Sequence, residues 1–593
     1  MSKFRKQTPD SEKISKGKVI VRMFGYLFKH PWHLLLVVFL TIASNVLALA
    51  APSLSGKAID AIVSKGNVDY DTVFLNCALM IGCYILSAVL GFVNSVTMIN
   101  LSRKVVYIMR KQTFEHLADM PVGYFDKNQT GDLISRLTYD IDTINASLSN
   151  DLVQICAGLI TVIGSAVMMY KYAPVLMLVF LITIPVLIGI TVHRVRKVKP
   201  LFRKRSAMLG ELNGYTEEML SGQKTIRAYG KEKVMIGRFD THNEEAIEAY
   251  YNAEYHGCVI GPSVNFINNL SLSFISMFGA MLYIFTPSFT LGSLSSFVLY
   301  SRKFSGPVNE TANIISEIQS ATSAAERVFR LLDTPCEKKK GEDDKPIENV
   351  EGDIKIDNIS FSYEEDKQIL KNISVNIPKG STVAVVGPTG SGKTTIINLL
   401  MRFYDVNSGE IRIDGTNSAE SSLEDVRKSF AMVLQDTWLF AGTVAENIAY
   451  GTENASREDI EKAAKAAKIH DFIMSLPQGY DTLIDENGVN ISKGQKQLIT
   501  IARAILMDSP MLILDEATSN VDSRTERQLQ EAVNAVMKDR TSIVVAHRLS
   551  TVRHADVILV IKDGVLIEAG NHDELMALKD GFYKSLHNSQ WNV

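Results

Sequence analysis

The sequence predicts a multidomain protein. An all-α transmembrane domain of six helices, with long cytoplasmic helical extensions, precedes an α/β domain of the P-loop class. Three observations support this fold class. The 593 residues are too many for one compact domain. The first half contains long apolar runs, whereas the second half alternates strand-like and helical patterns. A glycine-rich segment at 387–394 lies between a strand pattern and a helical pattern.

The composition excludes some classes of protein. The formal net charge is -3, so no general basic surface indicates a nucleic-acid partner. The five cysteines form no CxxC pair or Cys/His cluster, and neither a disulfide framework nor a cysteine metal site is expected. They are Cys77, Cys83, Cys156, Cys258 and Cys336.

Five apolar runs are long enough to cross a bilayer, for which about 20 residues are needed. They lie near 33–54, 73–99, 152–171, 174–192 and 257–285. A sixth run near 288–312 is weaker, because Arg302 and Lys303 are costly if they face lipid. We include it as a span because these charges can face a pore and because the next domain is expected in the cytosol.

The distribution of Lys and Arg predicts the orientation in the membrane. Basic residues gather in 3–13, in 103–111 and in 194–205, whereas the connection 286–290 carries none. By the positive-inside rule, both termini and the C-terminal domain are cytoplasmic. The sequence therefore predicts a multi-pass protein of the cell membrane with a cytoplasmic N-terminal segment at 1–30.

The cytoplasmic connections are long, and 101–119 and 200–250 keep helical apolar spacing. We therefore expect the spans to continue as helices beyond the membrane. Gly-containing stretches at 120–132 and 227–233 mark the two turns. We interpret these tips as surfaces that press on another domain, with solvated hairpins as the alternative.

The expected boundaries are a transmembrane domain at 31–332, a charged linker at 333–352 and the α/β domain at 353–593. Several polar residues lie at the expected membrane depth. They line a cavity or form hydrogen bonds between helices, and the sequence leaves both open. They are Asn265, Asn268, Asn269, Tyr300, Arg302 and Lys303.

The segment 387–394 has the pattern G-x-x-x-x-G-K-T, which is typical of a loop that wraps phosphate at a helix N-terminus. Lys393 is expected to reach the β- and γ-phosphates, and the Thr394 hydroxyl to hold Mg²⁺. The predicted ATP-binding residues of this loop are Gly387, Pro388, Thr389, Gly390, Ser391, Gly392, Lys393, Thr394 and Thr395.

A second acidic site supports this interpretation. The apolar strand pattern 511–514 is followed by two carboxylates, Asp515 and Glu516. We expect Asp515 to steady Mg²⁺ through water and Glu516 to polarise the attacking water beside the γ-phosphate.

The order of these motifs resembles that of ATP-binding-cassette (ABC) exporters, in particular type IV half-transporters with a fused six-span domain. The resemblance covers essentially the whole chain. It implies that Tyr363 stacks on adenine, that Gln435 contacts Mg²⁺ and senses the membrane domain, and that His547 contacts the γ-phosphate. Glu516, His547 and Gln435 are then the catalytic residues. The segment 519–522 would form a loop that faces a second cassette.

One motif departs from the family pattern. ABC proteins carry a signature, usually LSGGQ, that covers the ATP held by the opposing domain. Here the segment 491–495 reads ISKGQ, and Ser492, Lys493, Gly494 and Gln495 are the predicted contacts. Lys493 replaces a glycine with a bulky, flexible cation. This change resembles the subunit of heterodimeric multidrug exporters that keeps the catalytic Glu, so a heterodimer is favoured over a homodimer.

The resemblance implies ATP hydrolysis coupled to export of a small molecule, lipid or peptide by alternating access. The partners would be a second, related half-transporter and the lipid bilayer, and the cofactors ATP and Mg²⁺. An importer of the same architecture and a nucleotide-gated channel or regulatory module remain alternatives. A soluble ATPase is disfavoured by the five apolar runs.

Overall fold

The computed structural model describes residues 15–590 except 65–66, 338–340, 342–343, 348–349, 365–366, 436, 485–490, 516–522 and 546–548. The chain divides into two compact units. The first comprises Met1–Ala118 and Gly131–Thr334, and the second comprises Asp119–Thr130 and Pro335–Val593.

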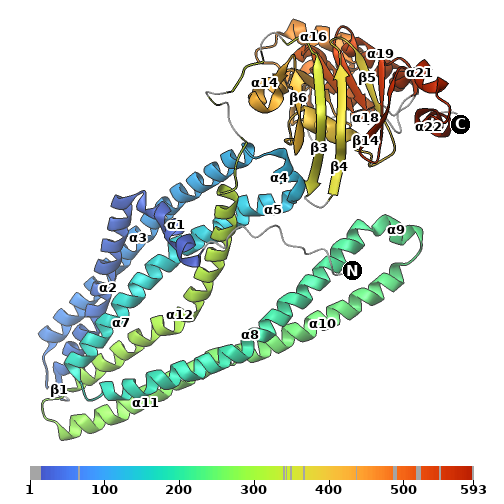
Figure 1. The fold of residues 1–593 in the computed structure, drawn as a ribbon. Helices are drawn as coiled ribbons and strands as arrows, with labels where there is room; N and C mark the ends of the chain where they lie inside the picture. The colour runs from blue at the N-terminus through green and yellow to red at the C-terminus, as the bar shows by residue number, and fades with distance from the viewer. Residues whose placement is uncertain are drawn as a thin grey trace. The chain divides into compact units, whose positions relative to one another are not determined.

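The described residues of the first unit form helices and one short antiparallel hairpin, β1 (Ile62–Ser64) and β2 (Asn67–Val68) (Figure 1). Among its helical elements, η1 and η2 are single π-helical stretches. The helical elements are α1 (Lys16–Phe28), α2 (Pro31–Asp60), α3 (Tyr70–Ala118), α5 (Thr130–Ser135), η1 (Arg136–Asp140), α6 (Ile141–Ala146), η2 (Ser147–Asp151), α7 (Leu152–Tyr172), α8 (Met177–Ser221), α9 (Gln223–Ala228), α10 (Glu232–Cys258), α11 (Ile260–Phe285) and α12 (Leu291–Leu332).

Several of these helices are longer than a bilayer span requires. The 49 residues of α3 extend over about 70 Å, at a rise of about 1.5 Å per residue. The expected helical continuation is confirmed, because α3 contains nearly all of 101–119, and α8, α9 and α10 contain nearly all of 200–250.

Four helical stretches of the described residues have the length and hydropathy needed to cross a membrane. They are Pro31–Asp60, Tyr70–Ala118, Thr130–Tyr172 and Glu232–Phe285. The expected spans at 174–192 and 288–312 lie mainly within α8 and α12, and as membrane spans they stay predictions.

Polar side chains of α12 bind the backbone of α2. Pro52 lies inside α2 and has no N–H, so the carbonyl of Ala48 lacks its helical donor. The Lys303 ammonium donates to that carbonyl at 2.7 Å, and the buried Tyr300 hydroxyl donates to the carbonyl of Leu49 at 2.6 Å. The sequence left two roles open for Tyr300 and Lys303. The structure shows that they form hydrogen bonds between helices rather than line a cavity.

The described residues of the second unit form three sheets. A six-stranded sheet has the order β14-β13-β5-β12-β11-β8, a four-stranded sheet has the order β4-β3-β6-β7, and β9 pairs with β10. The strands are β3 (Ile354–Glu364), β4 (Lys367–Ile377), β5 (Thr382–Val386), β6 (Ser408–Ile413), β7 (Thr416–Asn417), β8 (Phe430–Val433), β9 (Gly442–Thr443), β10 (Leu483–Ile484), β11 (Met511–Asp515), β12 (Thr541–Val545), β13 (Val557–Lys562) and β14 (Val565–Gly570).

Helices accompany the sheets in this unit (Figure 1). They are α4 (Val122–Lys127), α13 (Lys393–Leu400), η3 (Ser418–Glu420), α14 (Leu423–Lys428), α15 (Val444–Ala449), α16 (Arg457–Ala466), α17 (His470–Ser475), η4 (Gly479–Asp481), α18 (Lys493–Met507), α19 (Ser523–Met537), α20 (Leu549–Arg553), α21 (His572–Ala577) and α22 (Phe582–Gln590).

The six-stranded sheet lies between two apolar cores. Along β5, Val383 and Val385 face one core, whereas Ala384 and Val386 face the other. All five residues of β11 and of β12 are buried. Burial on both faces explains why these strands are continuous apolar runs rather than alternating ones.

Candidate functional site

Five strands of the six-stranded sheet run parallel, and four of them, β5, β12, β11 and β8, are neighbours that end at one edge. Val385 of β5 is level with Val545 of β12, and Val545 is level with Asp515 of β11. On the other side of β11, Leu514 is level with Val433 of β8. In open parallel sheets, ligands bind outside the carboxyl ends of the strands. The sequence predicts that four segments contact the phosphates or Mg²⁺ of the nucleotide. All four segments begin at this edge.

The loop that follows β5 needs its glycines. Gly392, the residue before α13, has φ 105°, and a Cβ there would lie 2.6 Å from Cδ2 of Leu370. A Cβ on Gly387 would lie 2.1 Å from the carbonyl oxygen of Ile561. Gly390 has φ 81°, which L-residues with a side chain rarely adopt. The loop can therefore turn tightly and present its backbone N–H groups.

Lys393 is the first residue of α13 and is only 9% exposed. Its ammonium donates to the carbonyls of Gly387 and Pro388, at 2.9 and 3.0 Å. Burial lowers the pKa of Lys393, and the carboxylate of Asp515 opposes that shift. The ammonium is thus bound by carbonyls of its own loop, and it lies near enough to Asp515 to feel its charge.

The loop fits the phosphates of a nucleoside triphosphate. The hydroxyl oxygen of Ser391 is buried and has no hydrogen-bond partner among the described residues. Thr394 is exposed in the first turn of α13, and the N-terminus of that helix favours an anion. An unpaired hydroxyl, a cation and a helix N-terminus together match the charge and acceptor oxygens of phosphate.

Tyr363 lies on β3, close to α13. Its hydroxyl donates to Oγ1 of Thr395 at 3.3 Å and accepts a hydrogen bond from Asn398 at 3.0 Å. Its half-buried ring meets Phe361 and Tyr404 edge to face, with centroids 4.8 and 5.0 Å apart. The structure brings this aromatic residue to the helix that begins at Lys393, and its stacking on adenine stays a prediction.

The remaining predicted residues of this edge are only partly described. Gln435 follows β8 by two residues and is exposed, and Asp515 is the buried last residue of β11. Glu516, His547 and the segment 519–522 lie outside the described residues.

Comparison with known proteins identifies the family. The ABC transporter transmembrane region matches residues 34–308, and the ABC transporter domain matches residues 370–519. The chain is 41% identical over 585 residues to the uncharacterized ABC transporter ATP-binding protein YfiC of Bacillus subtilis strain 168, covering 98% of this chain and 95% of the relative. The chain belongs to the ABC transporter family. The predicted class, a helical transmembrane domain before an α/β nucleotide-binding domain, is confirmed.

Two further relatives carry functional names. The chain is 39% identical over 524 residues to a fatty acid ABC transporter ATP-binding/permease protein of Mycobacterium bovis, covering 88% of this chain and 82% of the relative. It is 36% identical over 577 residues to an ATP-dependent lipid A-core flippase of Vibrio parahaemolyticus, covering 95% and 98%. This ABC transporter is therefore a membrane protein of the exporter type that couples ATP hydrolysis to transport.

The segment 491–495 of the transporter leads into α18. Ser492 caps this helix: its hydroxyl accepts from the N–H of Gln495 at 3.3 Å, and the Gln495 side chain accepts from the N–H of Ser492 at 2.9 Å. Lys493 is the first helical residue and is exposed. Within the described residues, no hydrogen bond joins 492–495 to the loop 387–394.

One contact of the cassette unit was not predicted. The turn at 120–132, between the second and third expected spans, contains α4, which belongs to this compact unit. The hydroxyl of Tyr404 donates to Asp126, and a Cβ on Gly123 would lie 2.7 Å from the Tyr404 ring. Burial and the Asp126 carboxylate raise the pKa of Tyr404. The sequence indicated a contact surface at 120–132, but no pattern around Tyr404 marked it as the partner.

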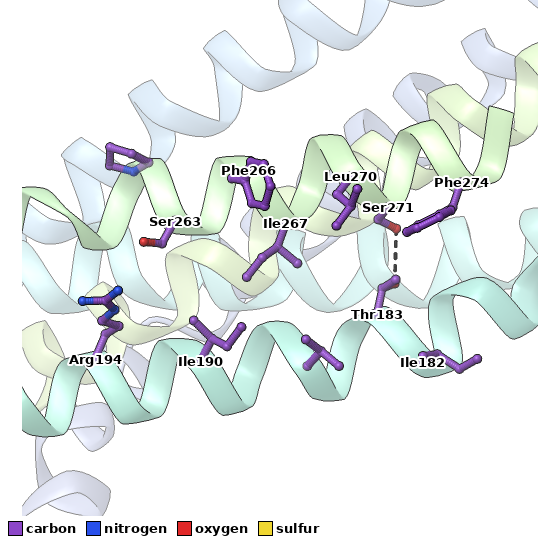
Figure 2. Close-up of a pocket in the computed structure, with 12 residues that line it drawn as sticks. Ile182, Thr183, Ile190, Arg194, Ser263, Phe266, Ile267, Leu270, Ser271 and Phe274 are labelled. Atoms are coloured by element: carbon purple, nitrogen blue, oxygen red, sulfur yellow. Dashed lines mark hydrogen bonds between the residues drawn. The ribbon is translucent and has the colours of Figure 1, made fainter. Parts of the chain in front are cut away.

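The transmembrane unit contains an apolar groove of about 680 Å³ between α8 and α11 (Figure 2). Ile182, Ile190, Phe266 and Phe274 are among its walls, and of the twelve described lining residues only Arg194 carries a charge. Thr183 and Ser271 form a hydrogen bond of 3.2 Å across the groove. Figure 2 shows Arg194 at one end, pointing from α8 toward Ser263 of α11. The sequence did not indicate this groove, because α8 and α11 are separated by α9 and α10.

We expect Lys393→Ala to weaken binding of Mg-ATP by the full-length transporter in nanodiscs at least tenfold. The substitution removes the buried cation that is predicted to bind the β- and γ-phosphates. Isothermal titration calorimetry measures the affinity, and the thermal unfolding midpoint checks the fold. The control is Lys379→Ala, an exposed lysine of the same unit that pairs with Glu351 at 2.9 Å. Equal affinity in the wild type and Lys393→Ala would contradict the assigned site.

Proposed function

We propose that this ABC transporter exports an anionic amphiphile with an acyl chain, such as a fatty acid or a lipid. The groove between α8 and α11 carries the proposal, because long apolar walls end at the guanidinium of Arg194. An acyl chain suits the walls, and a carboxylate or phosphate headgroup suits Arg194. The names of the relatives from Mycobacterium bovis and Vibrio parahaemolyticus support the same class of cargo.

The nucleotide site supplies the energy of this transport. In the proposed arrangement, Lys393 and the N-terminus of α13 bind the phosphates, and Tyr363 stacks on adenine. Thr394, Gln435 and Asp515 hold Mg²⁺, which neutralises phosphate charge. Glu516 polarises the attacking water, and His547 contacts the γ-phosphate. The common edge of β5, β12, β11 and β8 supports this assignment. Apart from Tyr363, all these residues lie in segments that begin at that edge.

Transport also requires a second cassette. We infer that this chain pairs with a related half-transporter whose intact signature covers the ATP held at Lys393. The capped start of α18 is intact, but Lys493 adds a cation and bulk where glycine is usual. Lys493 would cover the ATP that is bound by the partner, and ATP hydrolysis at that site would be slow. A homodimer with two altered sites is the alternative.

The proposed topology has six spans, with both termini and the cassette in the cytoplasm. Closure of two cassettes would move the long helical extensions and open the cavity between the spans outward. The hydrogen bond between Tyr404 and Asp126 supports a mechanical connection at the first turn.

We expect Glu516→Gln to leave Mg-ATP affinity nearly unchanged and to lower ATP turnover about a hundredfold or more, because an amide cannot activate water. Phosphate release and calorimetry measure the two quantities on the same preparation. Glu531→Gln, an exposed carboxylate of α19, is the matched control. Unchanged turnover in Glu516→Gln would show that another group activates the water.

The cargo is tested in inside-out vesicles with a fluorescent fatty acid. The wild type is expected to accumulate it in an ATP-dependent manner. Arg194→Gln should raise its apparent KM about tenfold, since a charge-assisted hydrogen bond is lost. The same acyl chain with a neutral headgroup should be unaffected. Arg196→Gln, two residues away on α8 and outside the groove lining, is the control. ATP-dependent movement in the opposite direction would contradict export, and an unchanged KM in Arg194→Gln would contradict the groove.

Pairing is tested with the chain purified alone. As half of a heterodimer it should hydrolyse ATP slowly, and Lys493→Gly should raise turnover several-fold by completing both sites of a homodimer. Lys496→Ala, in the same helix, should change nothing. Rapid hydrolysis by the wild type alone that Lys493→Gly does not increase would favour the homodimer.

A further inference from the structure

Three possible metal ligands meet in the transmembrane unit, and none of them lines the groove between α8 and α11. Glu211 lies on α8, and His242 and Glu245 lie on α10. One ligand atom from each residue lies within 4.8 Å of the other two. His242 and Glu245 are three residues apart and therefore share a face of their helix. A single ion at this point would join α8 to α10.

The imidazole of His242 is incompletely satisfied. Its Nδ1 atom is buried and has no hydrogen-bond partner among the described residues. A buried polar atom without a partner costs free energy, and a bound ion is one way to remove that cost. This observation is independent of the clustering of the three side chains.

The two carboxylates also lack a cation. In the described part of the chain, neither Glu211 nor Glu245 forms an ion pair with Lys or Arg. Elsewhere between the same two helices, Glu254 pairs with Arg205 at 2.5 Å. Two carboxylates held near each other repel, and a cation between them turns that repulsion into attraction.

The surroundings hold the imidazole in place. The Tyr215 ring of α8 lies 5.1 Å from the His242 ring, and the Tyr215 hydroxyl donates to the carbonyl of Met235 at 3.0 Å. Together with the Arg205–Glu254 pair, this contact fixes α8 against α10 on both sides of the cluster. The ligands thus come from a preformed hairpin, which lowers the entropic cost of binding an ion.

We propose that Glu211, His242 and Glu245 bind one divalent transition-metal ion, for which Zn²⁺ is the test ion. Tetrahedral ligands at about 2.1 Å from the metal lie about 3.4 Å apart. In the structure the ligand atoms lie within 4.8 Å of one another, so the exposed side chains of Glu211 and Glu245 would have to rotate toward the ion. An imidazole ligand disfavours Ca²⁺ and Mg²⁺, so the site is distinct in chemistry from the Mg²⁺ expected at the nucleotide. Water completes the coordination, and the ion ties α8 to α10.

The test uses the full-length transporter in nanodiscs, treated with chelator and free of nucleotide. Calorimetric titration with Zn²⁺ is expected to show one saturable site per chain with micromolar or tighter affinity. His242→Ala, Glu211→Gln and Glu245→Gln should each weaken it at least tenfold. Glu244→Gln and His256→Ala, which keep the cluster intact on the same helix, should bind as the wild type does. Mg²⁺ in millimolar excess should not compete.

Two further measurements make the result decisive. Zn²⁺ should raise the thermal unfolding midpoint of the wild type but not of Glu211→Gln, which keeps the size of the side chain. Titration with Co²⁺ should give ligand-field absorption without a thiolate charge-transfer band, which excludes Cys258. The proposal is wrong if no saturable site appears, if the three variants bind as tightly as the wild type, or if the two controls weaken binding equally.

Discussion

Close approach of the loop 387–394 to neighbouring segments is the constraint on which the cassette depends. A side chain on Gly387 or Gly392 would meet Ile561 or Leu370, so the loop keeps its course only with glycine. That course positions Lys393 at the start of α13, against two carbonyls of its own loop. The parallel register of β5 with β12 and of β12 with β11 then brings Asp515 to the same edge. Sheet and loop together form one site from segments far apart in the chain.

A different constraint governs the transmembrane unit. In lipid, every backbone polar group needs a partner within the protein. Pro52 interrupts the hydrogen bonds of α2, and Lys303 of α12 supplies the donor that the carbonyl of Ala48 has lost. A lysine that is costly toward lipid thereby becomes an internal hydrogen-bond donor between two helices. The same reasoning explains why Lys303, in the middle of the run 288–312, does not argue against a span there.

The sequence predicts local features well, because their physical cause is local. The phosphate loop is a contiguous motif between a strand and a helix, and the long helices follow from apolar periodicity that continues through 101–119 and 200–250. Contacts between distant segments could not be predicted. Nothing near Tyr404 indicates Asp126, and Glu211 and His242 meet only because the turn through α9 sets the register of α8 against α10. Lys303 was recognised as costly, but its partner depends on how α12 packs against α2.

In the proposed dimer, Lys493 would change the function of the segment 491–495 without changing the fold of α18. Ser492 and Gln495 cap α18 reciprocally, so the helix begins normally despite the substitution. Lys493 instead places a positive charge at the positive end of the helix dipole, at a cost of about 0.3–1 kcal/mol when no anion is near. In the proposed dimer, the phosphates of the opposing nucleotide would remove that cost. Lys493 would thus strengthen the dependence of closure on bound nucleotide, while its bulk holds the backbone away from the phosphate and slows hydrolysis there. Tight closure with slow hydrolysis is the behaviour expected of the regulatory site in an asymmetric pair.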